Sequence, residues 1–222
     1  YDYSESGLQD TINVLNDADI IYGLNEHTAT YTTDSGIVIG IVSANLLAAD
    51  EKHANYIRDG IKSLRDEGAD LVIASCHWGI EGDHYPNSYQ QEMAQQVIDW
   101  GADVLIGSHP HVLQGVELYN GKVICYSLGN FCFGGNRNPK VKDTAIYQQT
   151  FTFSDGILQK DISADIIPCT ISSTTARNDF QPTVAEGERK QAILDDMNDY
   201  SKPYSQAGFD SSGKLMGLEE EG

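Results

Sequence analysis

Three histidines and a glutamate in the middle of the chain carry the side chains best suited to chemistry. His77 follows one apolar run, with Glu81 four residues further on, and His109 and His111 follow the next apolar run and flank Pro110. Alternate side chains of an extended segment share a face and proline fixes the backbone, so His109 and His111 could address one ion. Together with His77 they form a ligand set suited to a divalent transition metal.

Other interpretations of these residues stay open. A His-x-His pair also occurs as ordinary polar loop residues, and Glu81 could be a ligand, a partner that orients an imidazole, or a solvated carboxylate. Trp78 is better suited to packing than to substrate contact. Cys76 and His77 are adjacent on a strand and point to opposite faces, which disfavours a cysteine nucleophile. Ser127 is not in a Gly-x-Ser-x-Gly elbow, and no glycine-rich phosphate loop is present.

The elements around these histidines follow a repeated order of helix, glycine-alanine-aspartate, buried strand and histidine. The repeat is marked by Gly68-Ala69-Asp70 and by Gly101-Ala102-Asp103. It predicts parallel β-α-β units, with helices at 48–67 and 90–100 and strands at 70–76 and 103–106. In such sheets ligands gather at the carboxyl ends of the strands, where the histidines lie.

The remaining pattern predicts one domain over residues 1–200 and a loosely held acidic tail over 201–222. The first part contains a helix at 4–17, a short strand at 20–22 and a hairpin of strands at 28–33 and 37–43. After His111 the pattern becomes antiparallel, with hairpin turns at Asn120-Gly121 and Asp155-Gly156. A final helix is expected at 186–199. The expected fold class is therefore α/β, with a parallel half followed by antiparallel hairpins.

Composition limits the function. The formal net charge of −19 in 222 residues repels nucleic acid and attracts metal cations, although acidity can also serve only to keep a protein soluble. The sequence contains no run of about 18 apolar residues, the length needed to span a membrane. No charged start followed by an apolar stretch appears at Tyr1, so we expect that any export signal was removed or lies upstream. The four cysteines show no disulfide spacing, so no obligatory disulfide is expected.

The chain resembles the bacterial capsule synthesis CapA family, which is associated with poly-γ-glutamate capsules and belongs to the calcineurin-like metallophosphoesterase superfamily. The motifs that carry the resemblance are His77-Trp78-Gly79-x-Glu81, the run from Gly101 to Gly115 with Gly107-Ser108-His109-Pro110-His111, and Tyr126-Ser127-Leu128-Gly129-Asn130-Phe131. The similarity extends to about Asn198 and includes Asn178-Asp179-Phe180-Gln181-Pro182.

The resemblance implies a metallophosphoesterase-like α/β/β/α sandwich that binds divalent metal ions, of Mn, Fe, Zn or Mg. His77 corresponds to the first metal-binding histidine of the superfamily's second half, and His109 and His111 to its closing Gly-x-His-x-His motif. His77 and His109 are the expected catalytic residues, and Glu81 and Asn130 line the site. Arg137 is a candidate for contacting an anionic substrate, or it is a surface loop arginine.

One departure from the family pattern concerns its first half. The aspartate and Asn-Asn-His motifs that supply the first ligands precede the helix at 4–17 in the family, and this sequence starts after them. We therefore expect a C-terminal portion of the domain that lacks at least one ion and is inactive alone.

The intact protein is expected to be a cell-surface, metal-dependent phosphoesterase-like hydrolase of capsule or poly-γ-glutamate biosynthesis. Its partners would be an acidic polymer or a phosphoester substrate and membrane-associated capsule machinery, but not nucleic acid. The alternative is a non-catalytic surface protein that binds or tethers an acidic polymer on the same scaffold.

Overall fold

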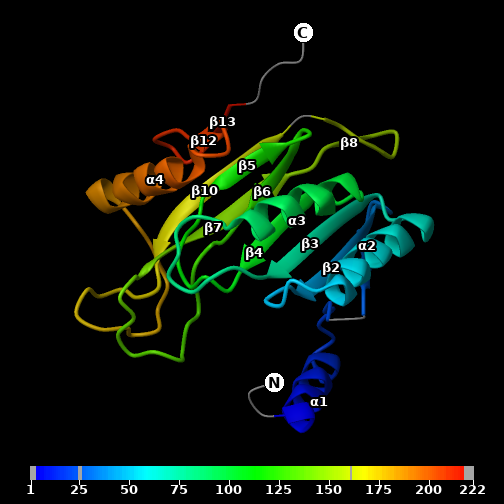
Figure 1. Ribbon diagram of the computed structural model, residues 1–222, viewed down its shortest axis with the longest axis horizontal. Coiled ribbons are helices and arrows are strands. Elements are labelled where there is room, and N and C mark those ends of the chain that lie inside the picture. Colours follow the sequence, from blue (N-terminus) through cyan, green and yellow to red (C-terminus); the bar gives the residue numbers. More distant parts are fainter. Residues whose placement is uncertain (1–3, 25–26, 161, 218–222) are drawn as a thin grey trace.

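The computed structural model describes residues 4–24, 27–160 and 162–217, and a six-stranded sheet forms its centre (Figure 1). The strand order is β1-β2-β3-β4-β6-β5, with β2, β3, β4 and β6 parallel and β1 and β5 antiparallel to their neighbours. The strands are β1 (Ala29–Thr32), β2 (Val38–Asn45), β3 (Leu71–His77), β4 (Val104–Ser108), β5 (Val116–Tyr119) and β6 (Lys122–Cys125). The predicted parallel β-α-β units are confirmed.

Helices α2 (Glu51–Asp66) and α3 (Ser88–Asp99) cover one face of this sheet. Asp50 caps α2 by accepting from the His53 amide, and Asn87 and Gln90 form a capping box at the start of α3. The helices and strands share a core of buried apolar side chains that includes Val42, Ile57, Ile61, Leu64, Trp78, Val97, Leu105 and Ile124. This core fixes the strands whose ends carry the histidines.

The aspartates of the two Gly-Ala-Asp repeats fasten the starts of neighbouring strands. Asp70 accepts a hydrogen bond from the Val38 amide at 2.8 Å, and its own amide donates to the Val38 carbonyl. Asp103 makes the same pair of bonds with Val72. Asp103 is buried and also accepts from Arg65 and Lys122. The repeat therefore sets the register of the parallel strands.

A second, antiparallel sheet packs against the other face and completes the layered α/β fold. It has the order β11-β10-β7, with β7 (Asp143–Thr150), β10 (Ser163–Thr170) and β11 (Thr183–Val184). The short strands β8 (Phe153–Ser154) and β9 (Ile157–Leu158) form a hairpin, and α4 (Gly187–Ser201) contacts β5 and β10. A second core joins the two sheets and α4 through Val116, Val123, Cys125, Ile166, Ile193, Leu194 and Met197.

Two segments differ from their predictions. The predicted strand at 20–22 does not form: Ile20 and Ile21 are exposed, and no strand among the described residues pairs with them. They follow α1 (Ser4–Asp17), a helix that buries none of its residues and stands apart from the sheet layers in Figure 1. No helix in the described ranges is long and apolar enough to cross a membrane.

Part of the predicted tail is folded onto the body. Strands β12 (Gly208–Phe209) and β13 (Leu215–Met216) form a hairpin after α4, and Phe209 and Leu215 join the second core. The Ile166 amide of β10 donates to the Gly213 carbonyl at 2.7 Å. The segment was predicted to be loosely held because its composition is acidic. Burial of its few apolar side chains in the second core holds it against the body instead. Residues 218–222 lie outside the described ranges.

Candidate metal site

The carboxyl ends of the parallel strands bring the sequence-predicted histidines together. The register pairs His77 with Asn45 of β2 on one side and with Ser108 of β4 on the other. The imidazole rings of His77 and His109 lie 4.7 Å apart, and those of His109 and His111 lie 5.9 Å apart. His77 also lines a groove of about 640 Å³ between α1 and the ends of β2 and β3. The site therefore opens to solvent.

The backbone at His109 and His111 is not extended, although the sequence predicted an extended segment. Both have left-handed backbones, with φ of 99° and 59°, and Pro110 lies buried between them. A non-glycine residue in this region costs about 1–3 kcal/mol and persists only when its surroundings hold it. Two such residues flanking one proline indicate that packing imposes this arrangement of the imidazoles.

Asn130 holds His111 through two hydrogen bonds. Its amide nitrogen donates to the His111 carbonyl at 3.1 Å, which orients its oxygen toward His111 Nδ1 at 2.7 Å. That Nδ1 therefore carries the proton, and the lone pair lies on Nε2. A metal-binding histidine is commonly oriented in this way by a partner on its other ring nitrogen.

Glu81 is brought to the two histidines by the loop between β3 and α3. The Gly82 amide donates to the Pro110 carbonyl at 2.8 Å, and the Gln114 side chain donates to the Asp83 carbonyl at 2.9 Å. His84 Nδ1 donates to the Leu113 carbonyl at 2.9 Å. These bonds fasten the loop along residues 110–114, and sequence reasoning missed them because both partners lie in irregular segments.

Glu81, His109 and His111 form a group that could share one cation. Their candidate ligand atoms all lie within 4.8 Å of one another. A cation with ligand bonds of about 2.1 Å holds its ligand atoms roughly 3–4 Å apart, so movements of about 1 Å complete the geometry. This donor set of two imidazoles and a carboxylate fits a divalent transition metal. Glu81 thus lies among the possible ligands, whereas the sequence left its role open.

His77 stands beside this group. Ser108 Oγ lies 3.3 Å from His77 Nδ1. Burial, and then the neighbouring rings of His109 and His111, lower the pKa of His77. This shift favours the neutral imidazole, which is the form that binds a metal or accepts a proton.

Close packing beneath the site leaves no room for a side chain at Gly107. A Cβ there would lie 2.0 Å from the Tyr126 carbonyl oxygen and 2.6 Å from Trp78 Nε1. Trp78 is fully buried, and its Nε1 donates to the same carbonyl at 3.0 Å. Trp78 therefore packs beneath the site.

Cys76 is also buried, which raises the pKa of its thiol and disfavours a nucleophilic thiolate.

Arg137 lies in an exposed loop after Asn130, and its guanidinium has no hydrogen bond or ion pair within the described residues. The Arg137 carbonyl accepts from the Asn178 amide at 2.9 Å, so the backbone of this loop is fixed. The structure thus leaves the charge of Arg137 available to a ligand.

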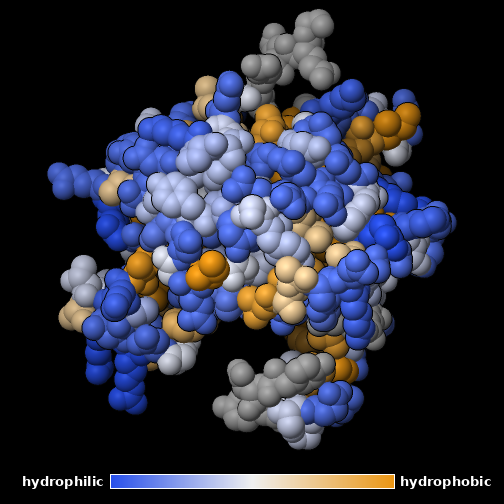
Figure 2. Space-filling model, in the orientation of Figure 1, coloured by the Kyte–Doolittle hydropathy of each residue, from blue (hydrophilic) through white to orange (hydrophobic). Residues whose placement is uncertain are grey.

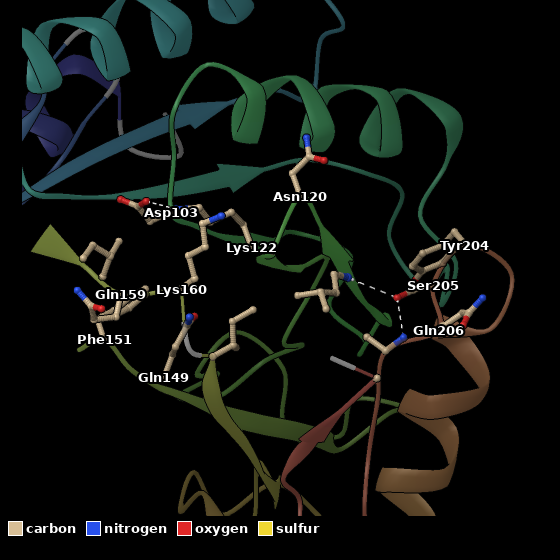
Figure 3. A pocket seen from close by; sticks show the side chains of 16 residues that line it. Asp103, Asn120, Lys122, Gln149, Phe151, Gln159, Lys160, Tyr204, Ser205 and Gln206 are labelled. Carbon is tan, nitrogen blue, oxygen red and sulfur yellow. Dashed lines mark hydrogen bonds and ion pairs between the residues drawn. The ribbon is translucent and has the colours of Figure 1, made fainter. Parts of the chain in front are cut away.

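A larger cavity, of about 890 Å³, lies at the other end of the sheet (Figure 3). It is lined by side chains that include Lys122, paired with Asp103, and Gln149, Lys160 and Tyr204. None of the histidines lines this cavity. The potential metal ligands Glu81, His109 and His111 instead converge at the carboxyl ends of the strands.

The fold and the site define a layered α/β protein with a histidine and carboxylate group at the carboxyl edge of its parallel strands. Residues 1–135 match the family model described as bacterial capsule synthesis protein PGA_cap. The chain belongs to this family.

Two curated relatives carry matching descriptions. The capsule biosynthesis protein CapA of Bacillus anthracis is 32% identical over 168 residues, which cover 66% of this chain and 41% of the relative. The PGA biosynthesis protein CapA of Bacillus subtilis is 48% identical over 80 residues, which cover 36% of this chain and 21% of the relative. The chain thus spans less than half the length of these relatives.

Among solved structures, the chain is similar to one described as a novel phosphatase from Mycoplasma pneumoniae. The TM-score is 0.39 and the identity 13%, and the match covers 73% of this chain and 58% of the other. A likeness this weak carries no argument about the chemistry of the site.

Proposed function

We propose that this chain supplies one side of a divalent-metal site in a phosphoesterase-like hydrolase that acts in capsule or poly-γ-glutamate biosynthesis. The grouping of Glu81, His109 and His111 at one edge of the sheet carries the proposal. Family membership supports the biological setting. The proposed location is the bacterial cell surface, with the anionic polymer or a phosphoester as substrate and membrane-associated capsule machinery as partner.

Glu81, His109 and His111 would hold the cation, with Asn130 orienting His111 and His77 beside His109 as a further ligand or proton carrier. A divalent cation bound there supplies Lewis acidity toward a phosphoester oxygen. The protein's part is to fix the ligands and to leave the groove beside His77 open for substrate.

The test is metal content and turnover of bis(p-nitrophenyl) phosphate by the whole natural protein, with and without the substitution His109→Ala. We expect the variant to lose bound metal and most of its activity, because a ligand is removed from the group. His53→Ala is the matched control, since His53 lies at the start of α2 and bonds to Asp50. Equal metal content and equal activity in His109→Ala and the wild type would refute the proposal.

The rival function is a non-catalytic protein that binds an acidic polymer. It predicts polymer binding without turnover in the same assay. Because the chain has a net charge of −19, the sequence suggests that such binding needs a bridging metal.

A further inference from the structure

Two loops beside the histidine site carry a charge opposite to that of the whole protein. We call residues 131–142 and 171–181 the basic lobe. It contains four of the chain's 14 lysine and arginine residues but one of its 33 acidic residues. A local surplus of positive charge in a protein of net charge −19 creates a site that can attract anions locally.

Hydrogen bonds join the two loops of the basic lobe to each other. Asn178 is buried, and its side-chain amide donates to the carbonyls of Phe133 at 2.9 Å and Asn136 at 3.2 Å. Its backbone amide donates to the Arg137 carbonyl at 2.9 Å. Lys142 Nζ donates across the lobe to the Thr175 carbonyl at 2.8 Å. These bonds fix the relative positions of the two loops and of the charges that they carry.

Asp179, the one acidic residue of the basic lobe, is engaged in holding the second loop. Its carboxylate accepts from the hydroxyls of Ser173 and Ser172 and from the Ser173 amide. The Ser173 hydroxyl, followed by that of Ser172, holds the pKa of Asp179 well below its usual range. The carboxylate forms no ion pair with a cation of the lobe within the described chain.

Three cations of the lobe have no partner within the described residues. Arg137, Lys140 and Arg177 are exposed, and no hydrogen bond or ion pair engages their charged groups there. Surface cations elsewhere often have acidic neighbours, as Lys62 has in Asp66. The lobe therefore offers unpaired positive charges on a fixed backbone, which reduces the ordering cost of binding an anion.

The basic lobe adjoins the candidate metal site. Asn130, which orients His111, immediately precedes it, and the Phe133 ring centroid lies 5.3 Å from that of His111. In Figure 1 the two loops lie together at the lower left, and in Figure 2 this part projects from the body with a hydrophilic tip. A chain-like ligand on the lobe could therefore extend to the histidines.

We propose that the basic lobe binds an extended polycarboxylate chain, through Arg137, Lys140 and Arg177, and presents it to the histidine site without a bridging metal. This inference rests on the proposed function, because the proposed role in capsule or poly-γ-glutamate biosynthesis is what brings an anionic polymer to the protein. An extended polycarboxylate carries single negative charges spaced by roughly 3.5 Å or more along its chain. Separate carboxylates can therefore pair with the separate cations of the lobe. Nucleic acid fits less well, because the isoelectric point of about 4.4 is far from the basic range of nucleic-acid-binding domains.

The test is the affinity of the 222-residue chain for fluorescent poly-γ-glutamate, measured by anisotropy at low and at physiological salt, with and without EDTA. We expect binding that persists in EDTA and weakens with salt. The triple variant Arg137→Gln, Lys140→Gln and Arg177→Gln should bind on the order of 10-fold more weakly, since three ion pairs are lost. The control variant Arg58→Gln, Lys62→Gln and Lys202→Gln changes the net charge equally but leaves the lobe intact.

Three results would overturn the inference: no binding by the wild type, equal binding by both triple variants, or binding that EDTA abolishes. Tighter binding to a single-stranded oligonucleotide of the same charge would overturn the assignment to a polycarboxylate. The assay requires neither metal nor turnover, so its failure is distinguishable from the failure of the proposed hydrolase function.

Discussion

Asn130 offers a sharp test of the candidate metal site because it contacts a possible ligand and is not one itself. Its two hydrogen bonds to His111, at 2.7 Å and 3.1 Å, hold the ring with the lone pair on Nε2. In Asn130→Ala both bonds are lost, and His111 can rotate and exchange tautomers. The histidine itself is retained, so any change in metal affinity reports on its orientation.

The expected loss of metal affinity follows from the bond of Asn130 to the ring nitrogen of His111 that does not face the metal. Removing a group that orients a metal-binding histidine typically weakens metal affinity by about 10- to 100-fold. This range corresponds to about 1.4–2.8 kcal/mol of binding free energy. Because these bonds orient the ring before the metal binds, their loss adds the cost of ordering a freed imidazole, about 0.5–1.5 kcal/mol, and of selecting its tautomer.

The assay is isothermal titration of Mn²⁺ or Zn²⁺ into metal-free protein, accompanied by thermal unfolding of the same samples. Asn138→Ala is the matched control, because it removes an exposed amide from the neighbouring loop. If Asn130→Ala binds metal within threefold of the wild type while remaining folded, then His111 is not a ligand or Asn130 does not orient it.

Two further predictions concern groups that hold the framework of the site. Asp103→Asn should lower the free energy of unfolding by about 2–3 kcal/mol, because it leaves two partly exposed cations without their buried partner. Asp70→Asn, which keeps the equivalent backbone bond, should cost less than about 1 kcal/mol, and equal losses in urea titrations would contradict this role for the ion pairs. Because the folded-state pKa of Asp179 is lowered, its stabilisation is complete above its unfolded pKa and is lost as the pH falls toward the folded value. The stability difference between the wild type and Asp179→Asn should therefore shrink below about pH 4, and a difference that stays constant in unfolding curves down to about pH 2 would refute the prediction.

The local elements of the fold are largely readable from short stretches of sequence. The turns predicted at Asn120-Gly121 and Asp155-Gly156 form with positive φ at all four residues. Such turns depend on residues that tolerate the left-handed region, and this tolerance is a property of the residue itself. The strand and helix rhythm before each histidine is equally local, because apolar periodicity reflects which side of an element will be buried.

Other features depend on contacts between distant segments. Ile20 and Ile21 have the composition of a strand but pair with no strand in the part of the chain that the structure describes. The segment after α4 has an acidic composition but buries Phe209 and Leu215. In both cases tertiary packing overrides the local preference. The role of the two Gly-Ala-Asp repeats also depends on distant partners. Asp70 and Asp103 bond to the amides of Val38 and Val72, which lie more than 30 residues earlier in the chain.

The sequence by itself determined that His77, His109 and His111 follow strand-like runs, and parallel strands bring such ends to one edge of a sheet. Only the tertiary structure decided that Glu81 joins His109 and His111, that Asn130 orients His111, and that two loops share a basic lobe beside them. The physical reason is that strand periodicity repeats every two residues and can be read locally. The contacts that complete the site join irregular segments 19 or more residues apart, and no local pattern encodes which of them will meet.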